Sequence, residues 1–346
     1  MRLLLLALLT TVFISCGNNG PDYTKIEITP VYEDSVSVRA IAPLDANRVW
    51  FAANKGRVGL IDNATPKLAT IKYQDSLLAF RSIAVTSKHV FVLSIETPAV
   101  LYKIDFDGTE ATNITSVYEE EGPKVFYDAM TFWNDQEGIA MGDPTEGCLS
   151  ILITRDGGSH WEKMACEALP PTQPGEAAFA ASNTNISVVS DHTWIATGGA
   201  KARVFYSPNK GKDWSVYNTP IVQGGAMTGI YSIDFWDENN GIIMGGDWGN
   251  KTFNEGNKAI TKDGGKTWRL ISNGEGPGYR SCVQYVPGTE GKGIVAVGTP
   301  GISYSKDGGN SWSELSKESF YSIQFVNDSI AFASGAQRIS RLVFKK

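Results

Sequence analysis

The sequence predicts an all-β chain folded as a seven-bladed β-propeller, whose ring is closed by an N-terminal strand that completes the last blade. Three observations lead to this prediction. Similar strand-turn-strand units recur at intervals of roughly 40 to 50 residues. One turn pattern recurs four times between Thr154 and Trp312. No useful helical period of apolar residues appears after the first residues of the chain.

Each unit consists of an aromatic-rich strand, a polar turn and a strand that ends in small residues, and is about as long as one four-stranded blade. The units begin near residues 38, 80, 127, 179, 230, 279 and 320. The last unit ends after a third strand, Ile339–Phe344, and an unassigned strand, Lys25–Tyr32, precedes the first unit. That strand can supply the missing outer strand, so residues 23–346 are predicted to form one closed domain.

The recurring turn has the pattern Ser/Thr-x-Asp-x-Gly-x-x-Trp, with an asparagine at the acidic position of the second copy. The acidic or amide residue and the tryptophan are Asp156 and Trp161, Asn209 and Trp214, Asp263 and Trp268, and Asp307 and Trp312. The side-chain oxygen accepts backbone N–H groups across a tight turn, glycine supplies a positive φ, and tryptophan covers the hairpin. We expect these residues to be structural rather than catalytic.

The N-terminus predicts an export signal over residues 1–15. Arg2 precedes an apolar run, Leu3–Ile14, that is too short to cross a hydrocarbon core of about 30 Å. The run ends in Phe13-Ile14-Ser15-Cys16, which resembles the lipobox of bacterial lipoproteins and implies lipidation of Cys16. Residues 16–22 then form a flexible tether. The expected location is extracytoplasmic and membrane-anchored, at the periplasmic face or cell surface of a Gram-negative bacterium; an ordinary cleaved signal is the alternative.

Charge and motif content exclude several classes of function. The chain has 37 acidic and 31 basic residues, a net charge of −6 and no basic run, which argues against nucleic acid as a partner. Three isolated histidines and four cysteines offer little for a metal site, and the carboxylate-rich loop Asp247–Glu255 is interpreted as solvated. No Gly-x-Gly-x-x-Gly joins a strand to a helix, which argues against a nucleotide-dependent oxidoreductase. We expect no metal and no cofactor.

The cysteines suggest one disulfide. Cys148 and Cys166 flank the turn Asp156-Gly157-Gly158 symmetrically, so the two strands of a hairpin can bring them together in an oxidising compartment. Cys282 aligns with apolar positions of the other units and is predicted to be buried.

The four turns resemble the Asp-box, or sialidase-type (BNR), repeat of β-propellers. Taken with the repeated units and strand starts such as Phe80-Arg81-Ser82-Ile83, residues 23–346 resemble the photosystem II stability/assembly-factor family of propellers. The resemblance implies a non-catalytic scaffold that binds a protein or glycan partner at the mouth of the ring. We expect a monomer that reaches the membrane through its lipid.

A sialidase-like, glycan-active hydrolase is the alternative, because sialidases share this repeat. Their chemistry needs three arginines around a sugar carboxylate, a tyrosine nucleophile assisted by a glutamate, and an acid/base aspartate. Only Phe80-Arg81-Ser82-Ile83 is near their Arg-Ile-Pro start, and both Ile and Pro are out of place. We therefore predict that the protein is not an enzyme.

Alignment of the units places one position of every unit at the ring mouth. These residues are Arg39, Arg81, Asp128, Ala180, Tyr231, Arg280 and Tyr321. Arg39, Arg81 and Arg280, with Tyr321 among them, are predicted to form an electropositive site for a carboxylate-bearing partner. Equally, the arginines can tie neighbouring units together. Trp248, in a long glycine-flanked loop, either anchors a partner or packs under its own loop.

Overall fold

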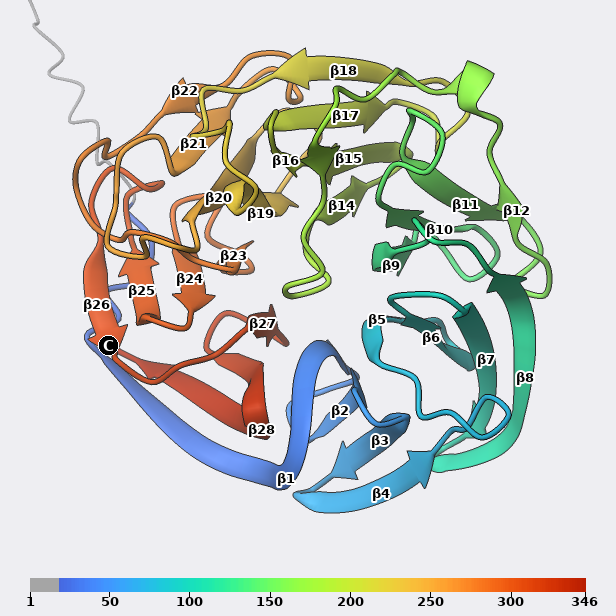
Figure 1. The fold of residues 1–346 in the computed structure, drawn as a ribbon. Coiled ribbons are helices and arrows are strands. Elements are labelled where there is room, and N and C mark those ends of the chain that lie inside the picture. The colour runs from blue at the N-terminus through green and yellow to red at the C-terminus, as the bar shows by residue number, and fades with distance from the viewer. Residues whose placement is uncertain (1–18) are drawn as a thin grey trace, which may run out of the picture.

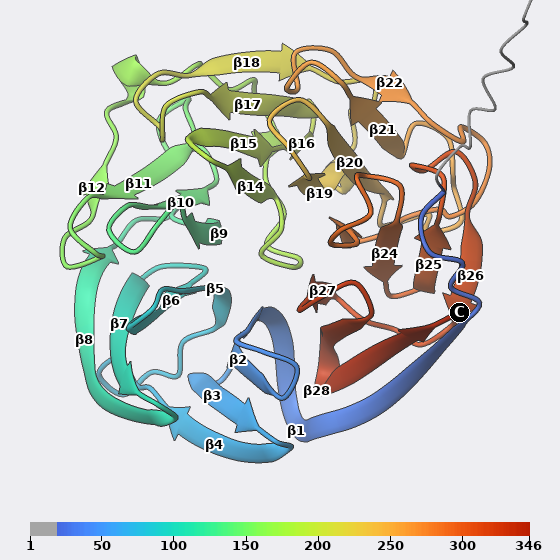
Figure 2. The ribbon, with the colours of Figure 1, turned by 180° about the vertical axis from the view of Figure 1, so that it is seen from behind.

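The computed structural model describes residues 19–346, so the predicted signal peptide, the lipidation site Cys16 and the start of the tether lie outside the described residues. Strands arranged around a central axis make up nearly all of this range (Figures 1 and 2). The prediction of an all-β propeller is therefore confirmed. A single turn of 3-10 helix, η1 (Cys166–Ala168), lies between β12 (Glu162–Lys163) and β13 (Glu176–Ala177). Within residues 19–346, no helix is long and apolar enough to cross a membrane.

The strands of residues 19–346 form six hydrogen-bonded sheets. In spatial order, the sheet that contains the first and last strands of the described residues consists of β27 (Ser322–Phe325), β28 (Ile330–Lys345), β1 (Lys25–Pro43), β2 (Arg48–Ala53), β3 (Arg57–Asp62) and β4 (Thr65–Thr70). The next sheet along the chain consists of β5 (Phe80–Val85), β6 (His89–Ser94), β7 (Ala99–Asp107) and β8 (Glu110–Glu120). The sheet after it consists of β12 (Glu162–Lys163), β11 (Ser150–Thr154), β10 (Gly138–Gly142) and β9 (Tyr127–Phe132).

The other three sheets complete the ring. The first consists of β14 (Ile186–Val189), β15 (His192–Ala196), β17 (Arg203–Ser207) and β18 (Ser215–Asn218). The second consists of β13 (Glu176–Ala177), β16 (Gly198–Gly199), β19 (Thr228–Phe235), β20 (Gly241–Asp247), β21 (Lys258–Thr261) and β22 (Arg269–Leu270). The third consists of β23 (Cys282–Tyr285), β24 (Ile294–Gly298), β25 (Gly301–Ser305) and β26 (Ser313–Ser316).

The predicted number of seven blades is wrong, because the described part of the chain has six sheets. The sequence treats the units that begin near residues 38 and 320 as separate blades. In the structure β1 and β28 are long and uninterrupted, so they join these two units in one six-stranded sheet. β1 pairs with β28 from Lys25 to Ser37 and with β2 from Val38 to Pro43. The boundary that the repeat pattern suggests is therefore an irregularity of the ladder between Glu33 and Ser37, and not the end of a strand.

The first described residues are fixed to the rest of the molecule. Lys25–Thr29 of β1 pairs in antiparallel register with Arg341–Lys345 at the end of β28, so the first and last strands of residues 19–346 share one ladder. Just before β1, Gly20 N donates to Lys306 O at 2.7 Å, and Lys306 forms an ion pair with Asp22 at 2.7 Å. The chain therefore enters the fold beside the turn that joins β25 to β26.

Apolar side chains from facing sheets form the core. Phe91 of β6 stacks on Phe132 of β9 at a centroid distance of 4.7 Å, and Trp194 of β15 stacks on Phe235 of β19 at 3.7 Å. Strands β2, β6, β10, β20 and β24 are almost entirely buried, because sheets cover both of their faces. Their mainly apolar composition, with polar residues only at the strand ends, follows from this position.

The four repeated turns have the same internal hydrogen bonds. At each one, the carboxylate or amide oxygen of the third position accepts a backbone N–H four residues later, at 2.8 to 3.0 Å. The glycine at the fifth position has a φ between 75° and 86° and donates its N–H to the first hydroxyl. Each turn also donates a backbone N–H to the inner hairpin of its own sheet, at Gln136 O, Asp191 O, Asn239 O or Lys292 O. The four copies thus brace the same end of their sheets.

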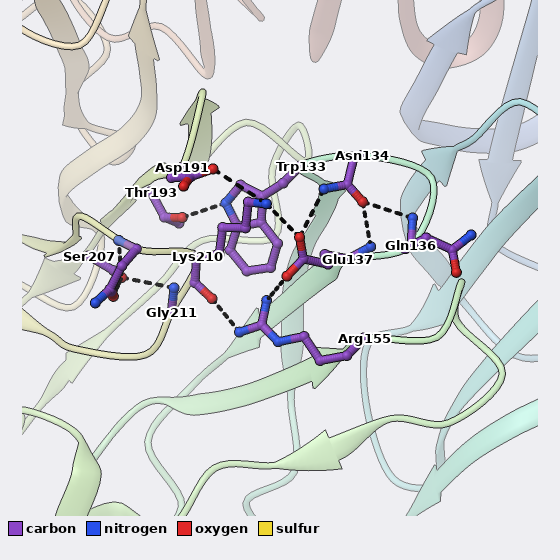
Figure 3. Close-up of polar contacts among 11 residues, drawn as sticks. Trp133, Asn134, Gln136, Glu137, Arg155, Asp191, Thr193, Ser207, Lys210 and Gly211 are labelled. Atoms are coloured by element: carbon purple, nitrogen blue, oxygen red, sulfur yellow. Dashed lines mark hydrogen bonds and ion pairs between the residues drawn. The ribbon is translucent and has the colours of Figure 1, made fainter.

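At that end, one polar network joins two neighbouring sheets (Figure 3). Glu137, in the β9–β10 hairpin, accepts hydrogen bonds from Arg155 at 2.9 Å and from Lys210 of the next sheet at 2.5 Å. Arg155 also donates to Lys210 O at 2.5 Å, and Trp133 Nε1 donates to Thr193 at 2.8 Å.

The described cysteines include one disulfide. Cys148 and Cys166 are bonded beside the β9–β12 sheet, with Cα atoms 5.6 Å apart, and Cys282 is free and buried.

Candidate functional site at the ring mouth

The ring mouth is the end of the channel at which the inner strands begin. Four of the predicted mouth residues occupy the same structural feature, a β-bulge in an inner strand. The pairing of β1, β5, β9 and β19 shifts at Arg39, Arg81, Asp128 and Tyr231 respectively. A bulge leaves one residue outside the ladder and redirects its side chain. The alignment of units by sequence therefore identified a real structural equivalence.

A short segment between β13 and β14 fills the channel beneath the mouth, and we call residues 178–185 the plug. Figure 1 shows this loop extending from the rim into the centre of the ring. Its side chains bond to strands on several sides of the channel. Ser182 Oγ donates to Ser281 O at 2.8 Å, Asn183 Nδ2 donates to Ile83 O at 2.9 Å, and Thr184 shares a hydrogen bond with Ser232 at 2.7 Å.

Buried polar contacts hold the base of the plug. Glu176 forms a bidentate ion pair with Arg203, at 2.5 and 3.0 Å, and Thr197 donates to the same carboxylate at 2.6 Å. Asp143 Oδ1 accepts the N–H of Ala178 at 2.7 Å, and burial raises the pKa of Asp143 to about 6. These contacts fix the segment that supports the mouth arginines.

Arg39 and Arg81 both face the plug. Arg39 Nη1 donates to Ala181 O at 3.2 Å, and Arg81 Nη1 donates to Ala180 O at 3.5 Å. The Arg39 guanidinium also lies over the ring of Tyr321, 4.2 Å from its centroid. Neither arginine forms an ion pair within residues 19–346, where the ion-paired arginines are Arg48, Arg57, Arg155, Arg203 and Arg338.

The two guanidiniums lack a full set of counter-charges and partners. Burial, and then the charge of Arg39, lowers the pKa of Arg81, while the charges of Glu96 and Asp128 only partly oppose this shift, as expected for two neighbouring cations. Arg39 Nε is buried and has no hydrogen-bond partner in the part of the chain that the structure describes. An anion at the mouth would supply both the missing charge and the missing acceptor.

Asp128 lies close to Arg81 but cannot serve as an exposed site residue, because its side chain is completely buried. Neither of its carboxylate oxygens has a hydrogen-bond partner among the described residues. Burial, and then the charge of Asp143, raises its pKa well above the usual range, while Arg81 opposes the shift. The neutral form of Asp128 is therefore favoured, and it compensates little of the arginine charge.

Arg280 does not join the other two arginines. It is only 4% exposed; its Nη1 donates to Tyr279 O at 2.8 Å and its Nη2 donates to Ser303 Oγ of β25 at 2.9 Å. Both bonds lie within the β23–β26 sheet and the residues that lead into it. Arg280 thus ties strands of its own sheet together, and not neighbouring units as the second interpretation of the sequence proposes, whereas Arg39 and Arg81 face the plug.

An exposed apolar patch adjoins the mouth, and we call Met227, Trp248 and Phe253 the rim patch. Their side chains are 43%, 46% and 37% exposed. Trp248 N donates to Met227 O at 3.1 Å, and the Lys251 ammonium lies 4.7 Å from the Trp248 ring centroid. Tyr231, which also donates to Met227 O, stacks on Phe179 of the plug at 4.0 Å and so connects the rim patch to the channel.

The plug is the part of the site that sequence reasoning missed. The unit near residue 179 is the loosest of the set, and it has the run Ala180-Ala181-Ser182-Asn183 where other units have a clear strand start. The signal was present in this departure from the pattern, because small and amide side chains suit a segment enclosed by strands. Among residues 19–346, no group of three or more His, Cys, Asp or Glu side chains is arranged to hold a metal ion.

Comparisons with known proteins support the fold. No family model matches the sequence, and a search of curated proteins finds no match. A solved structure described as YCF48 bound to D1 peptide has a TM-score of 0.67 with 13% identity, over 95% of this chain and 100% of that one. YCF48 from Cyanidioschyzon merolae has a TM-score of 0.62 with 16% identity, over 92% and 98% of the two chains.

An enzyme also has a similar fold. The GH74 xyloglucanase from Xanthomonas campestris has a TM-score of 0.64 with 13% identity, over 91% of this chain but 53% of that one. The resemblance to photosystem II assembly factors thus holds at the level of the fold, since YCF48 is among the structural neighbours. At these identities, similarity shows the shared propeller architecture and not a shared activity.

Proposed function

We propose that this protein is a non-catalytic scaffold that binds an acidic segment of a protein partner at the ring mouth. The observation that carries the proposal is the pair Arg39 and Arg81, which lie together without an ion-pair partner among the described residues, one of them with an unpartnered buried Nε. Paired N–H donors of a guanidinium match a carboxylate in charge and in geometry. The similar structure of YCF48 bound to D1 peptide supports the proposal, because it shows that a propeller of similar fold can bind a peptide.

The rim patch extends the proposed contact. An exposed methionine in the loop before β19, and an exposed tryptophan and phenylalanine in the loop after β20, give a partner apolar area to bury, and interface anchors are often aromatic. Lys251 beside Trp248 adds positive charge at the same place. A segment that combines carboxylates with an apolar side chain fits both parts of the mouth; a carboxylate-bearing glycan is the competing ligand.

Several features favour binding over hydrolysis. Arg280 is engaged within its own sheet, so three arginines do not converge, and Asp128 is too deeply buried to reach a substrate. The tyrosine–glutamate hydrogen bonds of the described residues involve Glu119 and Glu120, at the end of the outer strand β8. Neither glutamate contacts Arg39 or Arg81. The GH74 neighbour shows that the fold accommodates hydrolysis, which makes a hydrolase the second candidate.

The test of the mouth compares two variants of the full-length protein, captured from its own membranes and analysed by quantitative mass spectrometry. In R39Q/R81Q the charges are lost while amide donors remain, so the co-purified partner should fall at least about tenfold, as expected for the loss of charge-assisted hydrogen bonds. The control R48Q removes a partly exposed arginine that pairs with Asp45 outside the mouth, and should keep the partner. A folded double variant that still captures the same partner would refute the proposal. Release by a carbohydrate wash alone would favour the glycan.

We also propose that Cys16 carries a lipid and places the propeller outside the cytoplasm. The lipobox-like sequence Phe13-Ile14-Ser15-Cys16 after an apolar run supports this. Metabolic labelling with a palmitate analogue should mark the wild-type protein and not Cys16→Ala. Equal labelling of both proteins would exclude lipidation at this residue.

A further inference from the structure

The end of the channel opposite the mouth contains a pocket of about 410 Å³, which we call the lower pocket. Its walls are the last residues of the inner strands, including Pro43 of β1, Val85 of β5, Phe132 of β9 and Phe325 of β27. Asn183 and Thr184 of the plug also line it, so the plug separates the pocket from the arginines. The volume is within the range of pockets that hold small ligands.

One charged side chain lines the lower pocket, that of Asp234 on β19, and no lysine, arginine or histidine of residues 19–346 does. Two backbone groups fix the carboxylate: Tyr285 N donates to Oδ2 at 2.7 Å, and Phe235 N donates to Oδ1 at 3.0 Å. Each oxygen keeps one acceptor position free. Burial raises the pKa of Asp234 to about 7, which is the effect expected for a carboxylate without a cationic partner.

The neighbouring inner strands add oriented amides to one side of the pocket. Gln284 Nε2 donates to Gln324 Oε1 at 2.8 Å, while Gln284 Oε1 accepts the N–H of Phe325 at 3.0 Å. These bonds fix the direction of both amides. Other parts of the lining are small residues, Ala42 and Ala84, which leave room in the channel. This room lies beside the polar side chains of Asp234, Gln284 and Gln324.

A second hollow, of about 400 Å³, shares Asp234 with the lower pocket and extends towards the surface between β19 and β23. Trp236, 41% exposed, and Glu290 line it, and again no basic side chain of the described chain does. Asp234 and Trp236 are two residues apart in the chain. A cation that enters along this path meets an aromatic ring and then a carboxylate.

We propose that the lower pocket binds a primary ammonium group on a short aliphatic chain, with Asp234 as its counter-ion. The fixed carboxylate supplies the charge, the glutamine oxygens can accept further ammonium hydrogens, and apolar residues such as Ile41 and Met130 surround the aliphatic part. The group belongs either to a free alkylamine or to a lysine side chain of a partner. The site is independent of the proposed mouth site, because the plug lies between them.

The experiment is isothermal titration calorimetry of the full chain with n-pentylamine at pH 8.5, where both Asp234 and the amine are mainly charged. The uncharged n-pentanol serves as ligand control. Asp234→Asn keeps an acceptor for one of the two backbone N–H groups and loses the charge, and should weaken pentylamine binding at least about tenfold. Glu238→Gln removes one charge from the same β19–β20 hairpin outside both hollows and should bind as the wild type does.

Ala42→Leu gives a second test, because it fills the lower pocket without changing Asp234, and should also abolish binding. If circular dichroism shows that Asp234→Asn does not fold, the Ala42→Leu variant alone tests whether pentylamine binds in the lower pocket. R39Q/R81Q should bind pentylamine normally, which separates this site from the mouth. Binding that is equal for pentylamine and pentanol, or unchanged in Ala42→Leu, would overturn the proposal.

A peptide pair identifies the source of the ammonium group. Binding of acetyl-Gly-Lys-Gly-amide, but not of its norleucine counterpart, indicates a lysine of a partner protein. Binding of pentylamine alone indicates a free amine. Binding of neither ammonium compound at millimolar concentration would show that the lower pocket is not an ammonium site.

Discussion

Residues that occupy the same aligned position can differ in role, as Arg39 and Arg280 show. The repeat alignment predicts that both lie at the ring mouth, because position along a strand is a local property. It does not reveal which groups each guanidinium meets. Arg280 finds Ser303 Oγ in its own sheet, whereas Arg39 finds a plug carbonyl that comes from a distant part of the chain. Side-chain partners that arise from tertiary contacts are therefore beyond the reach of the alignment.

The first prediction concerns Asp143, whose pKa burial raises to about 6. The folded protein holds this proton more tightly than the unfolded chain, so the residue costs stability as the pH rises from about 4 to 6 and beyond. Asp143→Asn keeps the acceptor for Ala178 N and removes the charge. Thermal unfolding should show a higher Tm than the wild type at pH 8, and a difference that shrinks towards pH 4. Asp75→Asn, an exposed loop substitution, should show neither effect.

Among the elements, the turns could be predicted and the plug could not. The four Ser/Thr-x-Asp/Asn-x-Gly-x-x-Trp turns close through bonds between residues four apart, so their sequence contains all that they need. The plug is stabilised by strands far away in the chain, such as β5, and by the residue that precedes β23. Its small side chains are informative only once the channel around them is known.

The second prediction concerns the polar network that joins the β9–β12 sheet to the β14–β18 sheet (Figure 3). Hydrogen bonds from Lys210 and Asn134 lower the pKa of Glu137 to about 2. Its stabilising contribution is therefore present above the ordinary glutamate pKa and is lost as the pH falls towards 2. Glu137→Gln should lower the stability at pH 7 by about 1 kcal/mol in urea unfolding, with a smaller difference at pH 3.

The control for Glu137→Gln is Glu110→Gln, which breaks an ion pair with Lys67 in which the glutamate is 75% exposed. Solvent screens that pair, so the change in stability should be close to zero. Equal effects of the two substitutions at pH 7 would show that the network does not hold the sheets together.

At the scale of the whole molecule, the repeats predict the architecture, and continuity of hydrogen bonding determines the number of sheets. The pairing of the N-terminal strand with the last strand could be predicted, because the final unit lacks an outer strand. The merging of β1 and β28 into one six-stranded sheet could not. This merging requires Lys25–Pro43 to form a single strand that pairs with both β28 and β2. No local residue pattern indicates a strand shared by two units.

The third prediction concerns this ladder. Deletion of residues 23–33 exposes the edge of β28 and uncovers Leu342 and Phe344, which pack against Tyr23, Ile26 and Ile28. An unpaired apolar edge invites association with other chains. Differential scanning calorimetry should show a Tm lower by more than about 10 °C, or light scattering should show oligomers. A monomeric truncated protein with the parental Tm would contradict this role of β1.

The place where the chain enters the fold also decides how an anchored molecule is oriented. Gly20 and Asp22 are bound at the β25–β26 turn, on the side of the ring where the inner strands end. With a lipid on Cys16, the few intervening residues span at most about 14 Å, so that side stays nearest the bilayer. The lower pocket would then face the lipid headgroups, and Arg39 and Arg81 at the ring mouth would face away from them. Partners of the two sites would approach from opposite directions, one from within the membrane layer and one from the open compartment.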